Sequence, residues 1–477
     1  MYAYLCIFST SLFFCADLVG VYFMFVGKKS PPGYEMLKKT TIIVEKHYLA
    51  LEGKNMDTRI LAQLEETFSE EIALVEQDLG SLEEMVIKKM RLLGQGLLQQ
   101  LVDRKPNGYK GSSQVCKCGG SMKFIQHRKK DIHTLFGWIK ISRAYYHCSD
   151  CGKSIFPYDV ASGLGSEQLS PGLAKACSLL AVDNSFEQTS RKVDELFGQN
   201  VSDTTIERIV QQVGSKALQQ QDKTLEDFLS SRRFPESEAA PQRLYVASDG
   251  TTVRETDGWH ECKVGVIYWE DERKDRKKSF VGRFDNSETF GWHVWLEACK
   301  CGLRQAKEIV YLGDGAPWIR TEHHRHFGRA TFIIDWFHAS EHVWDCGKII
   351  FGEGTEATEK WVCQHLDLLW DGWTKKLLDN LKEHRKKYRG AKREAMDGLI
   401  RYISSNEEQM RYDVFRTKGY DIGSGAVEGA CKNVVGKRLK QSGMIRSRTG
   451  SSATLALRIT WLNDKWEQLW QNKPLAA

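Results

Sequence analysis

The most informative stretch of the sequence is RLYVASDG (residues 243–250), a short apolar run that ends in an aspartate followed by glycine. The same pattern returns in EIVYLGDGA (308–316), which carries a second Asp-Gly pair near its end. Apolar runs of this length, bounded by turn residues, are typical of buried β-strands. We therefore expect Asp249 and Asp314 to project from the ends of two strands of one sheet.

Further strand-like and helical runs surround these two stretches. CKVGVIYWE (262–270) and KSFVGRF (278–284) follow the first aspartate, and a helical stretch extends from about Glu288 to Cys301. A short helix then precedes ATFIIDWFH (330–338). The order of three strands, helix, strand, helix, strand predicts an α/β fold with a ribonuclease H-like core. In that fold the first and fourth strands are neighbours, so their two aspartates are expected to meet.

The two aspartates suit a metal site. Carboxylates held close together repel each other unless a positive charge lies between them. Mg²⁺ or Mn²⁺ ions prefer oxygen ligands, and two ions about 4 Å apart can activate an attacking oxygen and stabilise a leaving one at phosphorus. A strand-end Asp-Gly can equally be a plain turn, and neither pair by itself decides between these interpretations.

A third carboxylate and a basic segment lie near the C-terminus. GSGAVEG (423–429) is a glycine-rich start of a helix, with Glu428 in its first turns and Lys432 one turn later on the same side. The most basic stretch of the chain follows. Next to a phosphoryl-transfer site, such a cluster predicts salt-sensitive binding of a DNA backbone, whereas the alternative is a solvated basic face. The cations expected to bind DNA are Lys432, Lys437, Arg438, Lys440 and Arg446.

Several segments, in this order, resemble insertion-sequence transposases of the ISKra type, which are related to the Mutator-like group. They are SDGTTVRE (248–255), WHECKVGVIY (259–268), GDGAPWI (313–319), IIDWFHASEHVW (333–344) and GSGAVEGACKNVVGKRLKQSGMIRS (423–447). The resemblance implies a DDE transposase with an all-helical insertion between the second aspartate and the glutamate. It also implies that Asp249, Asp314 and Glu428 are the catalytic, magnesium-binding triad.

The segment from Asp335 to His338 resembles the (Asp or Cys)-x-x-His pattern that follows the second catalytic aspartate in such enzymes. The resemblance implies that both residues support the site or position DNA. Asp335 is also a rival to Asp314 for the second metal carboxylate. Asp314 is preferred because it ends the strand expected beside the first one.

The implied chemistry is metal-assisted phosphoryl transfer without a covalent protein intermediate. Water frees a 3′-hydroxyl at the element end, and that hydroxyl attacks target DNA. The expected partners are double-stranded DNA, as terminal inverted repeats and target, and further copies of the chain in a homodimer or higher oligomer; no small-molecule substrate is expected. Two alternatives remain, namely a non-catalytic DNA-binding regulator and a ribonuclease H-like nuclease without strand transfer.

Four of the 13 cysteines form two close pairs, Cys116 with Cys118 and Cys148 with Cys151. The short alternating runs between the pairs predict β-hairpins. Two such thiolate pairs can close a tetrahedral zinc site in a zinc-ribbon-like module. Four thiolates leave no open position for catalysis, so this zinc would be structural. The alternative is four unrelated core cysteines.

Residues 185–214, SFEQTSRKVDELFGQNVSDTTIERIVQQVG, predict two helices joined by a turn. The first ends at Gly198, and the second begins after Ser202, a favourable N-cap residue. This pattern matches a helix-turn-helix, whose second helix would offer Thr204, Thr205 and Arg208 to DNA. Helix pairs of this kind also occur without DNA contact.

Composition sets broad limits on the chain. Its 477 residues allow about three domains. A net charge of +6, from 68 Lys and Arg against 62 Asp and Glu, is compatible with a polyanionic partner without requiring one. Cysteine pairs that bind metal indicate a reducing compartment, so we expect a cytoplasmic bacterial protein associated with the nucleoid.

The first 26 residues are apolar enough to resemble a membrane anchor. They can also arise from an over-extended start, with Met36 as the true first residue, or form a buried helix; anchoring is not expected. The expected parts are an apolar stretch (1–35), a helical region (36–105), a zinc-ribbon-like module (106–160), a helix-turn-helix region (161–240), the first part of the catalytic core (241–340), a helical insertion (341–420) and the Glu-bearing basic part of the core (421–477).

Overall fold

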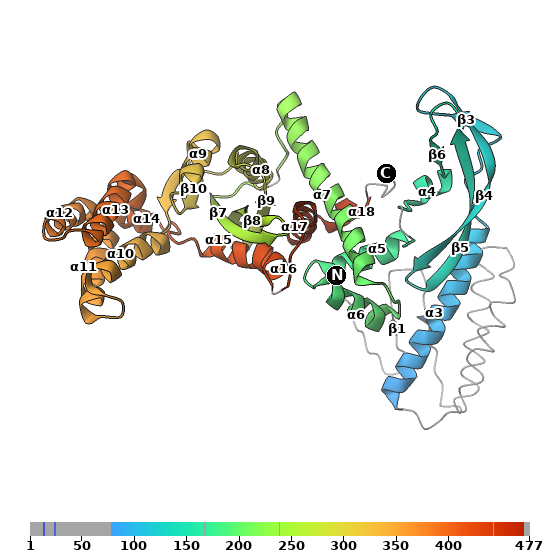
Figure 1. Ribbon diagram of the computed structural model, residues 1–477, viewed down its shortest axis with the longest axis horizontal. Coiled ribbons are helices and arrows are strands. Elements are labelled where there is room, and N and C mark those ends of the chain that lie inside the picture. The colour runs from blue at the N-terminus through green and yellow to red at the C-terminus, as the bar shows by residue number, and fades with distance from the viewer. Residues whose placement is uncertain are drawn as a thin grey trace. The chain divides into compact units, whose positions relative to one another are not determined.

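The computed structural model describes residues 13–14, 23–24, 78–165, 168–237, 239–441 and 443–471. The chain divides into two units, Met1–Leu97 and Leu98–Ala477. The described elements of the first unit are the short strands β1 (Phe13–Phe14) and β2 (Phe23–Met24) and most of helix α3 (Leu79–Asp103), which continues into the second unit (Figure 1).

Most expectations for the N-terminal region fall outside the described residues. This holds for the apolar stretch 1–35, apart from β1 and β2, and for the helical region 36–105 before residue 78. The described part of that helical region forms α3, as predicted. Within the described ranges, no helix combines the length and the apolar character needed to cross a membrane.

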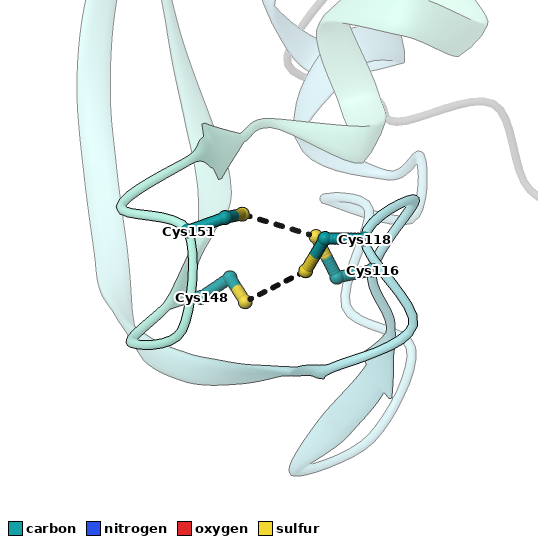
Figure 2. Close-up of side chains that lie close together, drawn as sticks. All are labelled: Cys116, Cys118, Cys148 and Cys151. Atoms are coloured by element: carbon teal, nitrogen blue, oxygen red, sulfur yellow. Dashed lines mark hydrogen bonds between the residues drawn. The ribbon is translucent and has the colours of Figure 1, made fainter.

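The second unit begins with an antiparallel sheet of four strands. Its strands are β3 (Ser113–Val115), β4 (Ser121–Thr134), β5 (Gly137–Cys148) and β6 (Ser154–Ile155), in that order, followed by helix α4 (Pro157–Ser162). The predicted hairpin is confirmed, since Thr134 pairs with Gly137 across the turn between β4 and β5. The loop after β3 and the end of β5 bring the four paired cysteines together (Figure 2).

Three helices follow, α5 (Pro171–Ala181), α6 (Phe186–Phe197) and α7 (Asp203–Ser231). The two predicted helices within 185–214 are confirmed, and so are their end signals. Ser185 forms a capping box with Gln188, Gly198 ends α6 in the left-handed conformation, and Ser202 caps α7 by accepting a bond from the Thr205 amide. Helix α7 extends to Ser231, well beyond the end of the predicted segment at residue 214. Its apolar side continues against a helix near the C-terminus.

The central sheet has five strands in the order β11-β10-β7-β8-β9. They are β7 (Arg243–Glu255), β8 (Gly258–Glu270), β9 (Arg276–Arg283), β10 (Glu308–Gly313) and β11 (Thr331–Ile334). β7, β8 and β9 are antiparallel, whereas β10 runs parallel to both β7 and β11. The expected adjacency of the first and fourth strands is therefore confirmed. The chain is a mixed α/β protein.

Helices cover both faces of this sheet and continue into a helical region. They are α8 (Ser287–Lys300), α9 (Pro317–His326), α10 (Trp336–Phe351), α11 (Glu356–Trp370), α12 (Thr374–Arg385), α13 (Ala391–Ser405), η1 (Glu407–Met410), α14 (Tyr412–Thr417), α15 (Gly425–Ala430), the π-helical turn η2 (Cys431–Gly436), α16 (Lys437–Leu439), α17 (Arg448–Leu462) and α18 (Trp466–Gln471). The segment 341–420 is helical, as predicted (Figure 1).

Alternate residues of β7 face opposite sides of the sheet. Leu244 and Val246 join a buried cluster with residues of α8 and α9. Tyr245 and Ala247 join a second cluster with residues of α15 and α17. Any later residue of β7 with an odd number therefore lies on the side of α15 and α17.

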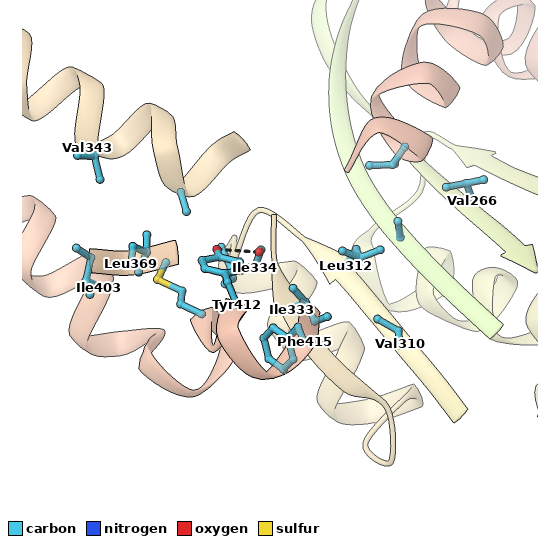
Figure 3. Close-up of a cluster of buried hydrophobic side chains, with 14 of the residues drawn as sticks. Val266, Val310, Leu312, Ile333, Ile334, Val343, Leu369, Ile403, Tyr412 and Phe415 are labelled. Atoms are coloured by element: carbon cyan, nitrogen blue, oxygen red, sulfur yellow. Dashed lines mark hydrogen bonds between the residues drawn. The ribbon is translucent and has the colours of Figure 1, made fainter. Parts of the chain in front are cut away.

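The second cluster continues from the sheet into the helical region. Val310 and Leu312 of β10 belong to it, and so do residues of α10, α13 and α14 (Figure 3). The hydroxyl of Tyr412 donates to the Ile334 carbonyl at 3.0 Å, which joins α14 to the end of β11. This packing fixes the helices that surround the carboxyl ends of β10 and β11.

Two contacts fix α17 against its neighbours. A Cβ atom built on Gly214 of α7 would lie 2.0 Å from the Ala453 carbonyl oxygen, so the two helices touch backbone to backbone. Just after α17, the Asn463 side chain accepts from the Phe280 amide and donates to the Phe280 carbonyl, each at 2.8 Å. The C-terminal helix is thereby joined both to α7 and to the outer side of β9.

Candidate active site

Asp249 lies on β7, and Asp314 directly follows the end of β10, the parallel neighbour of β7. The last pair between the two strands joins Ala247 to Leu312, two residues before each aspartate. Since Ala247 faces α15 and α17, Asp249 projects to that side of the sheet. The charge of Asp314 acts on the Asp249 carboxyl, so the two carboxylates lie near each other.

Asp335 extends this row onto the third strand. Gly313 pairs with Ile334, and the Asp335 amide donates to the Gly313 carbonyl at 2.9 Å. Its carboxylate is 5% exposed and already saturated with hydrogen bonds. It accepts from the amides of Phe337 and His338 and from both the amide and the hydroxyl of Ser424. Asp335 therefore caps α10 and holds the start of α15, which leaves Asp314 as the carboxylate with free capacity.

Helix α15 packs against β7 and β8. At its start, Ser424 contacts Asp335, which directly follows β11; just after its end, the Cys431 thiol donates to Asp249 Oδ2 at 3.4 Å. Glu428 lies between these two contacts in the sequence.

The side chain of Glu428 is not gathered with the two aspartates. It is 62% exposed, and its carboxylate pairs with Lys432 at 2.8 Å. The triad is absent from the groups of described residues whose metal-type ligand atoms all lie within 4.8 Å of one another. Solvent screens an exposed pair of this kind, so Glu428 can leave Lys432 at little cost.

Burial raises the pKa of the Asp249 carboxyl, and the negative charge of Asp314 raises it further. Hydrogen bonds from Cys431 and Gly250 and the charge of His338 oppose this shift. Two partly buried carboxylates therefore repel each other across β7 and β10, which is the condition that a bound divalent cation relieves. His338 lies close enough for its charge to act on Asp249.

Sequence reasoning missed two residues of this site, Ser424 and Cys431. Both lie near Glu428 in the sequence, and each contacts one of the aspartates, Asp335 or Asp249. Cys431 is three residues after Glu428, and that spacing places the two side chains on one helix face. This spacing could have predicted that Cys431 lies near the site. A cysteine among hydrophobic residues is more simply interpreted as a core residue.

The four paired cysteines form a compact cluster. All four sulfur atoms lie within 4.8 Å of one another, with Cys116 3.6 Å from Cys151 and Cys118 3.8 Å from Cys148 (Figure 2). A tetrahedral site with Zn–S bonds of about 2.3 Å requires sulfur separations of about 3.8 Å. A bond from the Lys153 amide lowers the pKa of Cys151, but bonds with Cys118 and the other thiols outweigh it and raise the pKa to about 12. The donor set and its spacing fit a zinc ion.

A family profile described as an uncharacterised protein family, UPF0236, matches residues 79–469. The chain belongs to the UPF0236 family. A relative from Streptococcus gallolyticus, the UPF0236 protein in the vanSb 3′ region, is 23% identical over 363 residues, which cover 72% of this chain and 75% of the relative. In this UPF0236 member, the cysteine cluster and the carboxylates at the strand ends all lie within the matched residues.

Three of the predicted DNA-binding lysines are exposed. Lys432 and Lys437 have side chains that are 75% and 57% exposed, and Lys437 lies 3.9 Å from Asp183. Lys440 donates to the Thr251 hydroxyl, two residues beyond Asp249 on β7. Lys432 therefore lies beside Glu428 and Lys440 beside β7, whereas Lys437 lies beside Asp183.

Arg438 and Arg446 are instead buried, at 0% and 9% exposed. Both guanidinium groups lie over the Phe186 ring, at 4.8 and 5.0 Å from its centroid. Arg438 also donates to the Ala181 carbonyl at 2.8 Å, and burial lowers its pKa to about 9. These two arginines join the C-terminal segment to α5 and α6 and offer no surface to DNA, contrary to the sequence-based expectation.

The remaining predicted DNA-binding residues lie at the start of α7. Thr204 and Arg208 are exposed, and Thr205 is half-buried. Arg208 donates to the Thr205 hydroxyl at 3.2 Å. On the opposite side of the same turn, Ile206 and Ile209 are buried. The first turn of α7 therefore presents its polar side outward.

Proposed function

We propose that this chain is a DNA transposase that cleaves and joins phosphodiester bonds at the ends of an insertion sequence. The observation that carries the proposal is the parallel pairing of β7 with β10, whose ends bring Asp249 near Asp314. The strand order, with three antiparallel strands followed by two parallel ones, supports a ribonuclease H-like core. The helical region between Asp335 and Glu428 supports an insertion within that core.

The donor set suits Mg²⁺ or Mn²⁺. Asp249 and Asp314 supply carboxylate oxygens, the ligands that these ions prefer, and Glu428 would complete the set after leaving Lys432. Such ions, when bound, supply positive charge at the attacking and leaving oxygens of a phosphodiester. The contacts of Asp335 with Ser424 support a positioning role, because they hold the start of α15, the helix that carries Glu428.

The chain's own residues then bind and orient the DNA. Lys432, Lys437 and Lys440 would hold phosphates beside the carboxylates. Water attacks a phosphodiester at the element end and frees a 3′-hydroxyl, which attacks target DNA in the same site. Positioning and charge stabilisation carry most of such reactions, so no covalent protein intermediate is required.

Recognition of the terminal inverted repeats is assigned to the N-terminal modules. A structural zinc on the four cysteines would stabilise the β3–β6 sheet as a zinc ribbon. The start of α7, with Thr204, Thr205 and Arg208, would enter the major groove as the second helix of a helix-turn-helix. Because two element ends must be held together, the active form would be a homodimer or a higher oligomer.

A strand-transfer assay in Mg²⁺ or Mn²⁺ tests this function. Labelled duplexes would carry the sequences that flank the gene. Wild type should give joined product, and Asp249→Asn, Asp314→Asn and Glu428→Gln should lose it. Asp335→Asn distinguishes the two assignments of the second ligand. If it abolishes the chemistry while Asp314→Asn retains it, the triad is Asp249, Asp335 and Glu428.

The same assay separates the competing functions. Cleavage without joining, lost in the same variants, would indicate a ribonuclease H-like nuclease. Specific binding of the duplex without chemistry in either metal would indicate a DNA-binding regulator. Absence of both binding and chemistry would contradict all three nucleic-acid functions.

A further inference from the structure

Phe337 is an exposed aromatic residue beside the row of carboxylates. Its side chain is 62% exposed, although it stands in the first turn of the 16-residue helix α10. The preceding residue, Trp336, takes the inward position and packs against Trp370 and Tyr412, with ring centroids 4.8 and 5.0 Å apart. Phe337 therefore points away from the aromatic core that orders this turn.

The exposed ring has one edge against the backbone of the segment that precedes α15. A Cβ atom built on Gly423 would lie 2.8 Å from Phe337 Cε2, so one edge of the ring rests on the glycine backbone. The Phe337 amide donates to Asp335, and the Trp336 amide donates to the Ile422 carbonyl at 2.9 Å. No aromatic ring among the described residues stacks on Phe337. The result is an apolar surface that is covered at one edge and otherwise open to solvent.

The position of Phe337 relative to the candidate site is fixed by its neighbours. Asp335, two residues earlier, continues the row of aspartates, and His338, the next residue, acts on the Asp249 carboxyl. Gly423, which the ring edge contacts, directly precedes Ser424, the N-cap residue of α15. Phe337 thus borders the same strand ends as Asp314 and the Glu428 helix.

We infer that Phe337 is a stacking surface for an unpaired DNA base next to the phosphate that is cut. This inference rests on the proposed function and names a feature of its substrate. Single exposed apolar side chains are common on protein surfaces, so exposure by itself is not the argument. Phe337 differs from such residues because its ring has one edge on the Gly423 backbone, an open face and a place beside the carboxylates.

Stacking on an aromatic ring suits this position chemically. Every base offers a flat face, so the contact holds a nucleotide without reading its identity. Holding one base out of the duplex would give the scissile phosphate room to approach carboxylates that lie at the ends of strands. The stabilisation expected from such stacking corresponds to an effect of about 5- to 150-fold on the unpaired population.

The inference is tested with 2-aminopurine, whose fluorescence rises when the base leaves the stack of a duplex. Duplexes carrying the gene's flanking ends would hold this base at successive positions on either side of the cut. Ca²⁺ replaces Mg²⁺ so that DNA binds without being cleaved, and anisotropy of a separate label reports binding. Wild type and Phe337→Tyr should raise the fluorescence at one position. Phe337→Ala should bind the duplex yet lose most of that rise.

A matched control is Trp373→Ala, because Trp373 is 60% exposed at the start of α12. This variant should keep the fluorescence rise. A second readout combines protein and substrate changes in a cleavage assay. An abasic nucleotide at the responsive position should make the cleavage rates of wild type and Phe337→Ala equal, because no base remains to stack.

The outcomes separate this inference from the function on which it rests. Specific binding by wild type without a fluorescence rise at any position would overturn the stacking role alone. An equal rise with Phe337→Ala would also overturn it. Failure of wild type to bind the duplex would contradict the proposed function and the stacking role together.

Discussion

At the scale of single residues, the folded chain disfavours the ionised form of the Asp249 carboxyl. Burial and the nearby Asp314 raise the pKa of its carboxyl, so the ionised form destabilises the folded state above the pKa of the unfolded chain. We expect Asp249→Asn to raise the Tm by a few degrees at pH 7, while DNA cleavage falls by at least about 100-fold because a metal ligand is lost. Calorimetry and the strand-transfer assay measure the two effects.

The metal dependence of the Tm provides the control for this prediction. Mn²⁺ should raise the Tm of wild type, because binding to the folded state alone stabilises it. It should not raise the Tm of Asp249→Asn in this way, because the variant lacks the carboxylate proposed to bind the ion. An Asn variant that is less stable than wild type in the absence of metal would show that Asp249 has a structural role instead.

Glu322 gives a prediction for the dependence of stability on pH. Burial raises the pKa of this carboxyl to about 8, although hydrogen bonds from Tyr311 and Ser248 oppose the shift. The folded chain keeps the proton up to about pH 8, whereas the unfolded chain releases it near pH 4.3. The free energy of unfolding should therefore fall as the pH rises through this window. Glu322→Gln should be more stable than wild type at pH 8, by about a few kcal/mol, and the difference should vanish near pH 4.

This prediction is measured by urea denaturation at several pH values. Only the difference between the two proteins matters, because other groups titrate in both. A Gln variant whose stability parallels that of wild type from pH 4 to pH 9 would show that Glu322 is ionised in the folded state at neutral pH.

The cysteine cluster gives a prediction for metal content. Cys148→Ser removes one of four thiolates, so we expect about one zinc per chain in wild type and nearly none in the variant. Repeat-end DNA should also bind more weakly, because the β3–β6 sheet loses its metal. Elemental analysis and anisotropy measure both effects. Cys363→Ser is the control, since Cys363 is an exposed free cysteine outside the cluster; equal zinc loss in both variants would contradict the site.

At the scale of elements, the contact between α7 and α17 is sensitive to a single methyl group. A Cβ atom on Gly214 would lie 2.0 Å from the Ala453 carbonyl oxygen, so Gly214→Ala must separate the helices. We expect it to lower the free energy of unfolding by about 1–3 kcal/mol or more. Gly398→Ala in α13 is the matched control, because nothing lies within 4 Å of its added Cβ. That variant should gain up to about 1 kcal/mol in helix propensity.

Denaturation curves of the two alanine variants decide this point. Equal stability of both would mean that α7 and α17 can move apart without cost, and the close approach would then carry no packing role.

The same helices show what local sequence could predict. Ser185, Gly198 and Ser202 mark their own helix ends through short-range hydrogen bonds, and these ends were predicted. The alternation of β7 and the order of the strands were likewise readable, because strand periodicity is local. The length of α7 was not, because Leu225 and Phe228 in its second half are buried against Leu296 of α8, about 70 residues later in the chain.

At the scale of the whole molecule, the C-terminal cations divide into exposed and structural groups. Lys432→Ala, Lys437→Ala and Lys440→Ala should each weaken DNA binding and reduce the slope of log K against log salt by about one. Arg438→Ala should instead lower the Tm and leave the salt dependence unchanged, because its guanidinium is buried over Phe186. Anisotropy titrations at several KCl concentrations measure the slopes. A reduced slope in Arg438→Ala with an unchanged Tm would contradict this division.

The sequence could not predict which of the C-terminal cations are exposed and which are buried, for a physical reason. Lysines and arginines in one basic run look alike until the tertiary contacts are known, and Arg438 finds its partners, Ala181 and Phe186, about 250 residues earlier. Asp335 is a similar case: the sequence placed it near the site, but only its four hydrogen bonds distinguish a cap from a candidate ligand. The positions of Asp249 and Asp314 followed from strand order, whereas the side-chain direction of Glu428 did not.

The contact between Asn463 and β9 has a consequence for the behaviour of the protein at high concentration. An outermost strand with unpaired amides and carbonyls is a template on which other molecules can add strands, and such growth leads to aggregates and fibrils. The Asn463 amide imitates a peptide group and occupies both outward-facing backbone groups of Phe280. A single side chain thus interrupts the template in the middle of the strand and keeps neighbouring molecules from extending the sheet.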